Sequence, residues 1–246
     1  TTGAHNVAVG CGALTSNTTS GENTAVGFGA LAAQSTGTPN DAFGNQSLCK
    51  LTTGCANVGI GFRALCDVTT SVDNVALGFV ALNSVTTGTG GNIGIGCTAG
   101  NSVTTGCFNT LIGTNAGTSI TTTEGNTYIG KSSGCNAVSG NNNTALGINS
   151  GVDAVKEITG SDAHNIVIGN NSNTHAYIKI DWTVTSDLRD KTNIEDVPHG
   201  LNFINQITPI KYDFKTSRED STPHGTKKYG FSAQEILKSY LIGVIW

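Results

Sequence analysis

A repeat of 17 residues runs through the first two thirds of this chain. An Asn residue recurs nine times at that step, with a single step of 18 residues across Thr89–Gly91. The recurring residues are Asn6, Asn23, Asn40, Asn57, Asn74, Asn92, Asn109, Asn126 and Asn143. A tenth copy begins at Asn165, after an insertion around residues 153–164. A fixed period of this length predicts a solenoid in which each repeat forms one coil.

The positions that follow each Asn are constrained as well. The third is apolar, as in Val26, Ile60 and Ile112, the fourth is Gly, and the seventh is Ala or Ser. Alternation with a period of two and β-branched residues at the first position predict a short β-strand, since 17 residues are too few for a helix pair. We expect the third-position side chains to be buried, and the Gly to mark a turn that needs a positive φ or a close backbone approach. Coils stacked about 4.8 Å apart would align the Asn side chains in one column, as an amide ladder.

The eighth position after Asn divides the repeat region in two. It is Leu in the first five coils and Gly in the next four. These residues are Leu14, Leu31, Leu48, Leu65, Leu82, Gly100, Gly117, Gly134 and Gly151. We therefore expect the cross-section of the solenoid, or a contact between subunits, to change halfway along it.

The coils hold few large side chains, which bears on how the chain assembles. A single column of such coils would have a thin core and would need capping at both ends. Three chains wound about one axis would pool their apolar faces and remove more surface from water. The repeat also resembles the head repeats of trimeric bacterial adhesins, although those are somewhat shorter. Both considerations predict a homotrimer.

Charge is distributed unevenly along the chain. Charged residues make up 12% of the sequence, and they are sparse over residues 1–151 but frequent from Ser186 onward. This shift predicts a repetitive β-solenoid shaft over residues 1–172, a strand-like connector over 173–185 and a separate module over 186–246. Neither half is basic, so we expect no nucleic-acid partner. No apolar run approaches the roughly 20 residues of a membrane span, so we expect no membrane insertion. The chain starts in mid-pattern at Thr1 without a Met and reads as a piece of a longer protein.

The residue types that bind metals show no ligand pattern. The seven cysteines fall at three positions of the repeat without zinc-type spacing, and the five histidines are scattered. We expect no metal and no other cofactor, and we expect the cysteines to be small buried thiols. Cys49 and Cys66 are the exception to watch, because they lie in adjacent coils, close enough for a disulfide. The carboxylates of the repeats are sparse and unpaired, which gives no support for a glycosidase site.

A different pattern begins where the repeats end. It runs Ser-Asp-Leu-Arg-Asp-Lys-Thr-Asn-Ile over 186–194, continues through 201–209 and Tyr212, and ends in Gly-Phe-Ser-Ala-Gln-Glu over 230–235. Together these blocks resemble the C-terminal intramolecular chaperone domain of phage tail spikes and tail fibres, of the self-cleaving endosialidase type. The resemblance covers about Thr185 to Lys238. Its motif residues here are Asp187, Arg189, Asn193, Pro209, Gly230, Phe231, Gln234 and Glu235.

The resemblance implies that the chain is cut between Thr185 and Ser186 by a catalytic pair, Ser186 and Lys191. Without the flanking blocks, the same two residues would fit a capped turn with a solvated lysine better. A hydroxyl is a poor nucleophile until a base takes its proton, and lysine is such a base only when neutral. Burial in a trimer interface would lower the pKa of Lys191 and so couple cutting to assembly. An offset of five residues does not place both groups on one helical face, so a turn or a neighbouring chain must bring them together. Each chain would cut once, and no external substrate is indicated.

Local patterns predict a small α+β fold for this module. Leu201, Ile204 and Ile207 form one face of a short helix that Pro209 ends. We expect a strand over 210–214, a charged loop over 215–228, and a strand over 229–233 that leads into a helix from Gln234. After Glu235 the resembled domain usually continues into more strand and long helices, whereas this chain ends at Trp246, so the module reads as truncated.

The predicted fold is therefore mainly β, a trimeric β-solenoid or β-roll of about ten coils followed by the small chaperone module. The first functional hypothesis is a structural or receptor-binding part of a phage tail fibre, carried on the virion and matured by removal of the chaperone segment. Its partners would be copies of itself and a host cell-surface receptor, with a glycan among the candidates. The alternatives are a trimeric adhesin head on a cell surface, which the repeat alone indicates, and a tailspike that degrades host polysaccharide.

Overall fold

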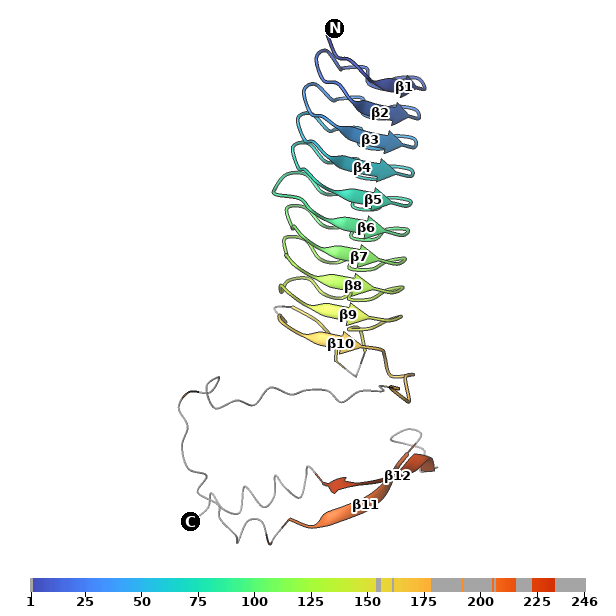
Figure 1. The fold of residues 1–246 in the computed structure, drawn as a ribbon, viewed down its shortest axis with the longest axis vertical. Helices are drawn as coiled ribbons and strands as arrows, with labels where there is room; N and C mark the ends of the chain where they lie inside the picture. The colour runs from blue at the N-terminus through green and yellow to red at the C-terminus, as the bar shows by residue number, and fades with distance from the viewer. Residues whose placement is uncertain are drawn as a thin grey trace. The chain divides into compact units, whose positions relative to one another are not determined.

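The computed structural model describes residues 2–153, 156–160, 162–177, 192, 205, 207–215 and 223–232. The chain divides into two compact units, Thr1–Tyr177 and Ile178–Trp246. The first unit is a β-solenoid with one short strand per coil, and its ten strands form one parallel sheet in chain order (Figure 1). The strands are β1 (Val7–Val9), β2 (Asn23–Val26), β3 (Asn40–Phe43), β4 (Asn57–Ile60), β5 (Val75–Leu77), β6 (Ile93–Ile95), β7 (Thr110–Ile112), β8 (Thr127–Ile129), β9 (Thr144–Leu146) and β10 (Ile166–Ile168). The β-solenoid predicted from the 17-residue period is confirmed.

Equivalent positions of neighbouring repeats pair throughout the sheet. Asn40 pairs with Asn57 and Phe43 with Ile60, and the register holds across the single 18-residue step, where Val75 pairs with Ile93. The extra residue is absorbed in the connecting loop, where Gly90 and Gly91 both adopt positive φ. Side chains of one repeat position therefore form one column along the shaft.

The prediction that the third-position side chains are buried is wrong. The Asn and the second-position side chain point into the coil, whereas the first and third positions point outward; Phe43 is 41% exposed and Leu77 is 44% exposed. The alternation of the strand explains this result, because a buried Asn places the second position inside and the third outside. The interior is narrow, and the second-position residues Ala25, Ala42 and Ala76 are completely buried in it.

The Gly at the fourth position meets both requirements expected of it. In Gly27, Gly44 and Gly61 the φ angle lies between 129° and 140°, a region that side chains with a Cβ rarely adopt. A Cβ on Gly27 would also clash with the carbonyl oxygen of Gly44 in the next coil. The turn after each strand therefore admits only glycine, which explains its strict period.

The change from Leu to Gly at the eighth position is an exchange of volume inside the coil. Leu82 and Gly134 have similar left-handed backbones, with φ of 47° and 58°. In the first half, Leu side chains fill the interior opposite small second-position residues; a Cβ on Gly94 would lie 2.6 Å from Cγ of Leu82. In the second half the eighth position is Gly, and in two of the four coils the large residue sits at the second position instead, as Leu111 and Tyr128. In the other two coils the second position is also small, and the eighth-position Gly leaves room for side chains of other positions, such as Ile158. The backbone and strand register are kept while the source of the core side chain changes.

The described part of the second unit is an antiparallel hairpin of β11 (Pro209–Lys215) and β12 (Pro223–Phe231), with an irregularity between Tyr212 and Phe214. The strand predicted over 210–214 is confirmed. The charged loop predicted over 215–228 is wrong from residue 223 onward, because β12 begins there. Proline is tolerated as the first residue of a strand, where its missing N–H costs no ladder bond, so Pro223 does not exclude a strand. Most of the helix predicted over 201–207, the helix predicted from Gln234 and most of the connector lie outside the described residues; residues 205 and 207 are described, and neither is helical.

Candidate functional site

The predicted cleavage site lies outside the described residues. This holds for both sides of the expected cut, for the catalytic pair and for most of the motif around it. The residues concerned are Thr185, Ser186, Asp187, Arg189, Lys191, Asn193, Gln234 and Glu235. The approach of the Ser186 hydroxyl to the Lys191 amine therefore stays a prediction.

Three motif residues of the C-terminal module meet at one end of the hairpin. Pro209 pairs with Phe231, and Ile210 pairs with Gly230. Along the same strands, the ammonium of Lys211 lies 5.3 Å from the centre of the Tyr229 ring, a cation–π contact. The hairpin thus joins the block that ends at Pro209 to the block that starts at Gly230, so these two sequence motifs form one local structure.

In the shaft, the recurring Asn side chains form a ladder of hydrogen bonds that is interrupted once, between Asn23 and Asn40, where Oδ1 of Asn23 accepts from Nε2 of Gln34 instead. The Oδ1 atom of Asn57 accepts from the backbone N–H of Asn74 at 3.1 Å and from its Nδ2 at 3.0 Å. The Nδ2 of Asn57 donates to the backbone oxygen of Ser71 at 2.9 Å. The same Asn-to-Asn bonds cross the 18-residue step and reach the tenth copy at Asn165. A buried carboxamide with its donors and acceptors satisfied stabilises each coil against the next. These residues therefore hold the shaft together and leave no free groups for a ligand.

A second ladder, of threonines at the twelfth position, was missed by sequence reasoning. The Oγ1 of Thr52 donates to the backbone oxygen of Thr69 at 3.0 Å, and the Oγ1 of Thr69 donates to that of Thr86 at 3.1 Å. Further along, Thr104 donates to Thr121 at 3.2 Å. The signal was present in the sequence, since most repeats carry two adjacent Thr residues at this place. The ladder adds a hydroxyl bond to carbonyl groups at a bend of the coil, each of which already accepts a backbone N–H of the preceding coil.

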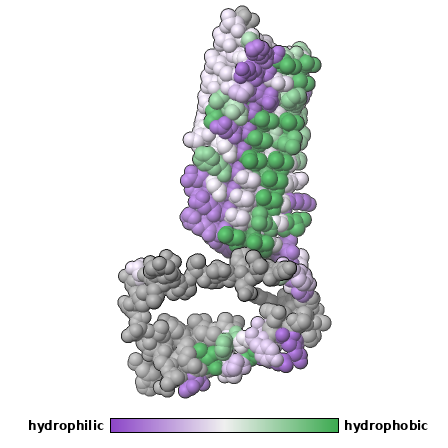
Figure 2. Space-filling view, viewed as in Figure 1, coloured by the Kyte–Doolittle hydropathy of each residue, from purple (hydrophilic) through white to green (hydrophobic). Residues whose placement is uncertain are grey.

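The outward side of the sheet carries a long apolar surface, which we call the outer apolar face. It consists of the side chains at the first, third and fifth positions of the coils. The large exposed ones are Val7, Val9, Phe28, Phe43, Ile60, Phe62, Leu77, Phe79, Ile93, Ile129, Ile148, Ile166 and Ile168. Figure 2 shows a green band at this place that runs along the long axis of the shaft, from one coil to the next. Phe62 and Phe79 stack on it with ring centres 5.3 Å apart. Exposed apolar patches of this extent mark interaction surfaces.

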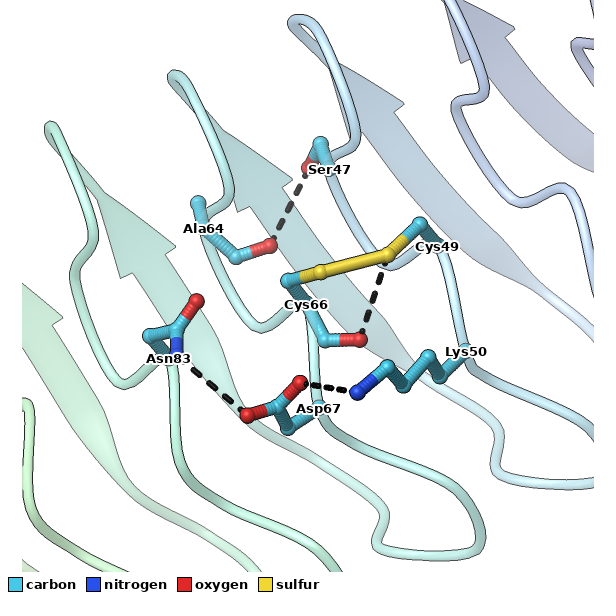
Figure 3. Close-up of a disulfide and its surroundings, with 7 residues drawn as sticks. All are labelled: Ser47, Cys49, Lys50, Ala64, Cys66, Asp67 and Asn83. Atoms are coloured by element: carbon cyan, nitrogen blue, oxygen red, sulfur yellow. Dashed lines mark hydrogen bonds and ion pairs between the residues drawn. A yellow bond between two sulfur atoms is a disulfide. The ribbon is translucent and has the colours of Figure 1, made fainter.

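Cys49 and Cys66 form a disulfide between adjacent coils, with Cα atoms 5.0 Å apart (Figure 3). Beside it, the ammonium of Lys50 lies 2.7 Å from a carboxylate oxygen of Asp67. The other carboxylate oxygen accepts from Nδ2 of Asn83 at 3.4 Å. The two cysteines whose spacing allowed a disulfide are therefore bonded. The disulfide links neighbouring coils on a polar side of the shaft.

The expectation of small buried thiols is wrong for the remaining cysteines. Cys11 and Cys97 are exposed, because the fifth position of the repeat faces outward. Cys55, Cys107 and Cys135 are half-buried, and burial raises the pKa of the Cys135 thiol. A single pattern of burial does not apply to all seven, because they occupy three positions with different surroundings.

The described part of the chain contains no clustered catalytic machinery. An open hollow of about 470 Å³ beside the first three coils is lined by side chains such as Phe28, Ala32 and Gln46, without a carboxylate. Among the described residues, no group of three or more His, Cys, Asp or Glu side chains could hold a metal ion. Nor do these residues include a helix long and apolar enough to cross a membrane.

Comparison with known protein families finds a match for one segment of the chain. Residues 186–240 match the family described as chaperone of endosialidase. No curated protein and no solved structure matches the chain. The matched segment follows the β-solenoid of 17-residue coils, and the combination fits a phage tail fibre or tailspike with a C-terminal chaperone.

Proposed function

We propose that the chain is a structural and receptor-binding part of a phage tail fibre, and that its C-terminal chaperone segment is released by self-cleavage between Thr185 and Ser186. The observation that carries this proposal is the match to the chaperone family over residues 186–240. The match begins at Ser186, the residue that the cut would leave at the start of the released segment. The proposed location is the virion, and the proposed partners are two further copies of the chain and a host cell-surface receptor.

The cut proceeds through an ester. Neutral Lys191 takes the proton of the Ser186 hydroxyl, and Oγ attacks the carbonyl carbon of Thr185. The Thr185–Ser186 amide bond breaks, its nitrogen takes up a proton and becomes the amino group of Ser186, and the acyl group is left on Oγ. Water then hydrolyses this ester, which gives a carboxylate at Thr185 and restores the hydroxyl of Ser186. The reaction consumes one water and happens once per chain.

Assembly supplies the condition under which Lys191 can act. An exposed lysine is charged at neutral pH and accepts no proton, whereas a lysine buried in a low-dielectric contact has a lowered pKa. In the proposed homotrimer, Lys191 enters such a contact only when the chains have associated. Cleavage would then report correct assembly and remove the segment that helped to achieve it.

The shaft supports a fibre role by its construction. Its coils are joined along the whole length by strand pairing, and over parts of it by the Asn and Thr ladders as well, so the unit is a regular rod of roughly 45 Å for ten coils. A rod whose coils repeat one bonding pattern can present a receptor-binding surface at a distance from its base. The described residues hold no pair of carboxylates at a cavity, and nothing there favours the polysaccharide-degrading alternative.

Intact-mass measurement of the full-length chain tests the proposal. The wild-type protein should give two products, one ending at Thr185 and one starting at Ser186. Ser186→Ala and Lys191→Ala should each remain uncut, because one lacks the nucleophile and the other lacks the base. The matched controls Ser172→Ala and Lys179→Ala should be cut normally. Normal cutting in Ser186→Ala would refute the assigned catalytic pair.

A further inference from the structure

The outer apolar face is large enough to be a subunit interface. Ten strands spaced about 4.8 Å apart give it a length of roughly 45 Å. Thirteen large apolar side chains are exposed along this length, in columns rather than scattered singly. Few monomeric proteins expose an apolar surface of that extent.

The two edges of this face match each other in polarity in seven of the ten coils. In the coil of Asn40, both the first and the fifth position are polar, Asp41 and Asn45. In the next coil both are apolar, Val58 and Phe62. Of the remaining coils, those of Asn6, Asn74 and Asn92 carry apolar pairs and those of Asn109 and Asn126 carry polar pairs. These pairs are Val7 with Cys11, Val75 with Phe79, Ile93 with Cys97, Thr110 with Thr114, and Thr127 with Lys131. The coils that begin at Asn23, Asn143 and Asn165 depart from the match.

Contact within one chain does not explain this match. The first position lies at the start of the strand, whereas the fifth lies beyond the Gly turn that follows the strand, so the third position and the turn separate the two side chains. A match between residues that do not touch is expected when each touches its counterpart in another copy. Asp41 beside an apolar ring would lose its hydration without compensation, whereas beside the carboxamide of Asn45 it can accept a hydrogen bond.

We propose that further copies of this chain cover the outer apolar face in parallel and in register, so that the first-position column of one copy meets the fifth-position column of the next at the same coil. A contact between two different edges of identical chains is heterologous and closes into a ring. The inference rests on the homotrimer of the proposed function, and it adds which surface is used and in what register.

An antiparallel arrangement does not reproduce the match. It brings like columns together and, with the shaft ends aligned, would place the coil of Asn57 against the coil of Asn109, and so set Val58 against Thr110 and Phe62 against Thr114. A glycan is a poorer occupant than a second copy, because from Val58 to Cys97 all three columns consist of aliphatic, phenylalanine and cysteine side chains. Sugar binding sites combine an apolar surface with placed polar groups, and this stretch of the face has none.

Sedimentation of the full-length chain with charges placed on the two edges tests the arrangement. Val75→Asp alone and Phe79→Lys alone should each weaken association by about 100-fold or more, because each buries an unpaired charge. The double variant Val75→Asp/Phe79→Lys should recover association to within about tenfold of the wild type, because the new carboxylate meets the new ammonium of the next copy. Thr70→Asp and Thr87→Lys, at exposed positions on another side of the coil, should associate like the wild type.

Three outcomes would overturn the inference. They are a wild-type chain that is monomeric at micromolar concentration, single variants that assemble normally, and a double variant as dissociated as the singles. A monomeric wild type that is still cut at Ser186 would refute the interface and leave the cleavage proposal standing. A chain that assembles through this face but stays uncut would refute the cleavage proposal and leave the interface standing.

Disulfide cross-linking decides the register even if the charged variants fail to fold. In a chain whose five free cysteines are replaced by Ala, Val58→Cys with Phe62→Cys should give cross-linked dimers and trimers on oxidation. The matched variant Val58→Cys with Thr110→Cys, which places its thiols as the antiparallel arrangement requires, should stay uncross-linked. Cross-linking of the second pair but not the first would refute the parallel register.

Discussion

The exchange of volume inside the coil predicts strong coupling between Tyr128 and Gly134. A Cβ on Gly134 would lie 2.6–2.7 Å from three ring atoms of Tyr128, and Tyr128 is completely buried. Gly134→Leu alone should cost about 2–5 kcal/mol, the sum of an overpacked core and a left-handed backbone at a residue with a Cβ. Tyr128→Ala alone should cost about 3–5 kcal/mol through the cavity it leaves.

The double variant Tyr128→Ala/Gly134→Leu rebuilds the arrangement of the first half of the shaft, with a small second position and Leu at the eighth. We expect it to lose only about 2–4 kcal/mol, so the coupling should exceed about 1 kcal/mol. Thermal unfolding followed by circular dichroism, at one protein concentration for all variants, measures this. At about 2–4 °C per kcal/mol for a chain of this size, the double variant should melt above the less stable single variant.

A non-matching double variant provides the control. The three atoms nearest to a Cβ on Gly134 all belong to Tyr128, so Leu111→Ala should not relieve the crowding caused by Gly134→Leu. The losses of that pair should add. If Tyr128→Ala/Gly134→Leu also lost the full sum of its single variants, the volume exchange would not explain the switch from Leu to Gly.

Three further predictions concern the same shaft. Burial raises the pKa of Tyr128 from 10.0 to about 12. The hydroxyl therefore ionises at lower pH in the unfolded chain than in the folded one, and the free energy of unfolding should fall by roughly 2–3 kcal/mol between pH 10 and pH 12. Denaturation midpoints of Tyr128→Phe should lack this part of the fall. Asn74→Ala should lower the unfolding free energy by about 3–5 kcal/mol, because it leaves buried donors of the next coil unpaired. The exposed Asn171→Ala, outside the outer apolar face, should change it by less than about 1 kcal/mol, and equal losses in urea titrations would refute the ladder's role. Gly61→Ala should lower the free energy of unfolding by at least about 3 kcal/mol, because its Cβ would clash with the backbone oxygen of Gly78. Gly160→Ala should lower it by only about 1–2 kcal/mol, because a Cβ there has nothing within 4 Å. Similar melting temperatures for the two variants would contradict the close packing of the turns.

The period of the sequence is sufficient to predict the coil, the strand and the Gly turn, because equivalent residues of a solenoid have equivalent surroundings. It is not sufficient to choose which residues of the strand point inward. The apolar third position suggests a strand whose apolar side is the core, but a shift by one residue moves every side chain to the other face. The second position holds the missing clue. It is small in Ala25, Ala42 and Gly59 because the interior is narrow, and a buried Asn can occupy that interior only with its ladder bonds satisfied.

The C-terminal module shows a different limit. Its charged, Pro-containing segment has the composition of a loop, yet residues 223–228 form a strand because they pair with β11, a tertiary contact that local composition does not encode. The motif blocks around Ser186 and Gly230 indicate the chaperone family, and the match over 186–240 agrees with them. Spacing along the chain cannot bring Ser186 and Lys191 together, since their approach depends on a turn or on a neighbouring chain.

Self-cleavage is decided by sequencing the N-terminus of the smaller fragment released from the full-length protein. We predict that this fragment begins with Ser-Asp-Leu-Arg, at Ser186, and that the remaining shaft ends at Thr185. A chain that stays whole after assembly, or a fragment that begins at any other residue, would contradict the proposed release of the chaperone segment.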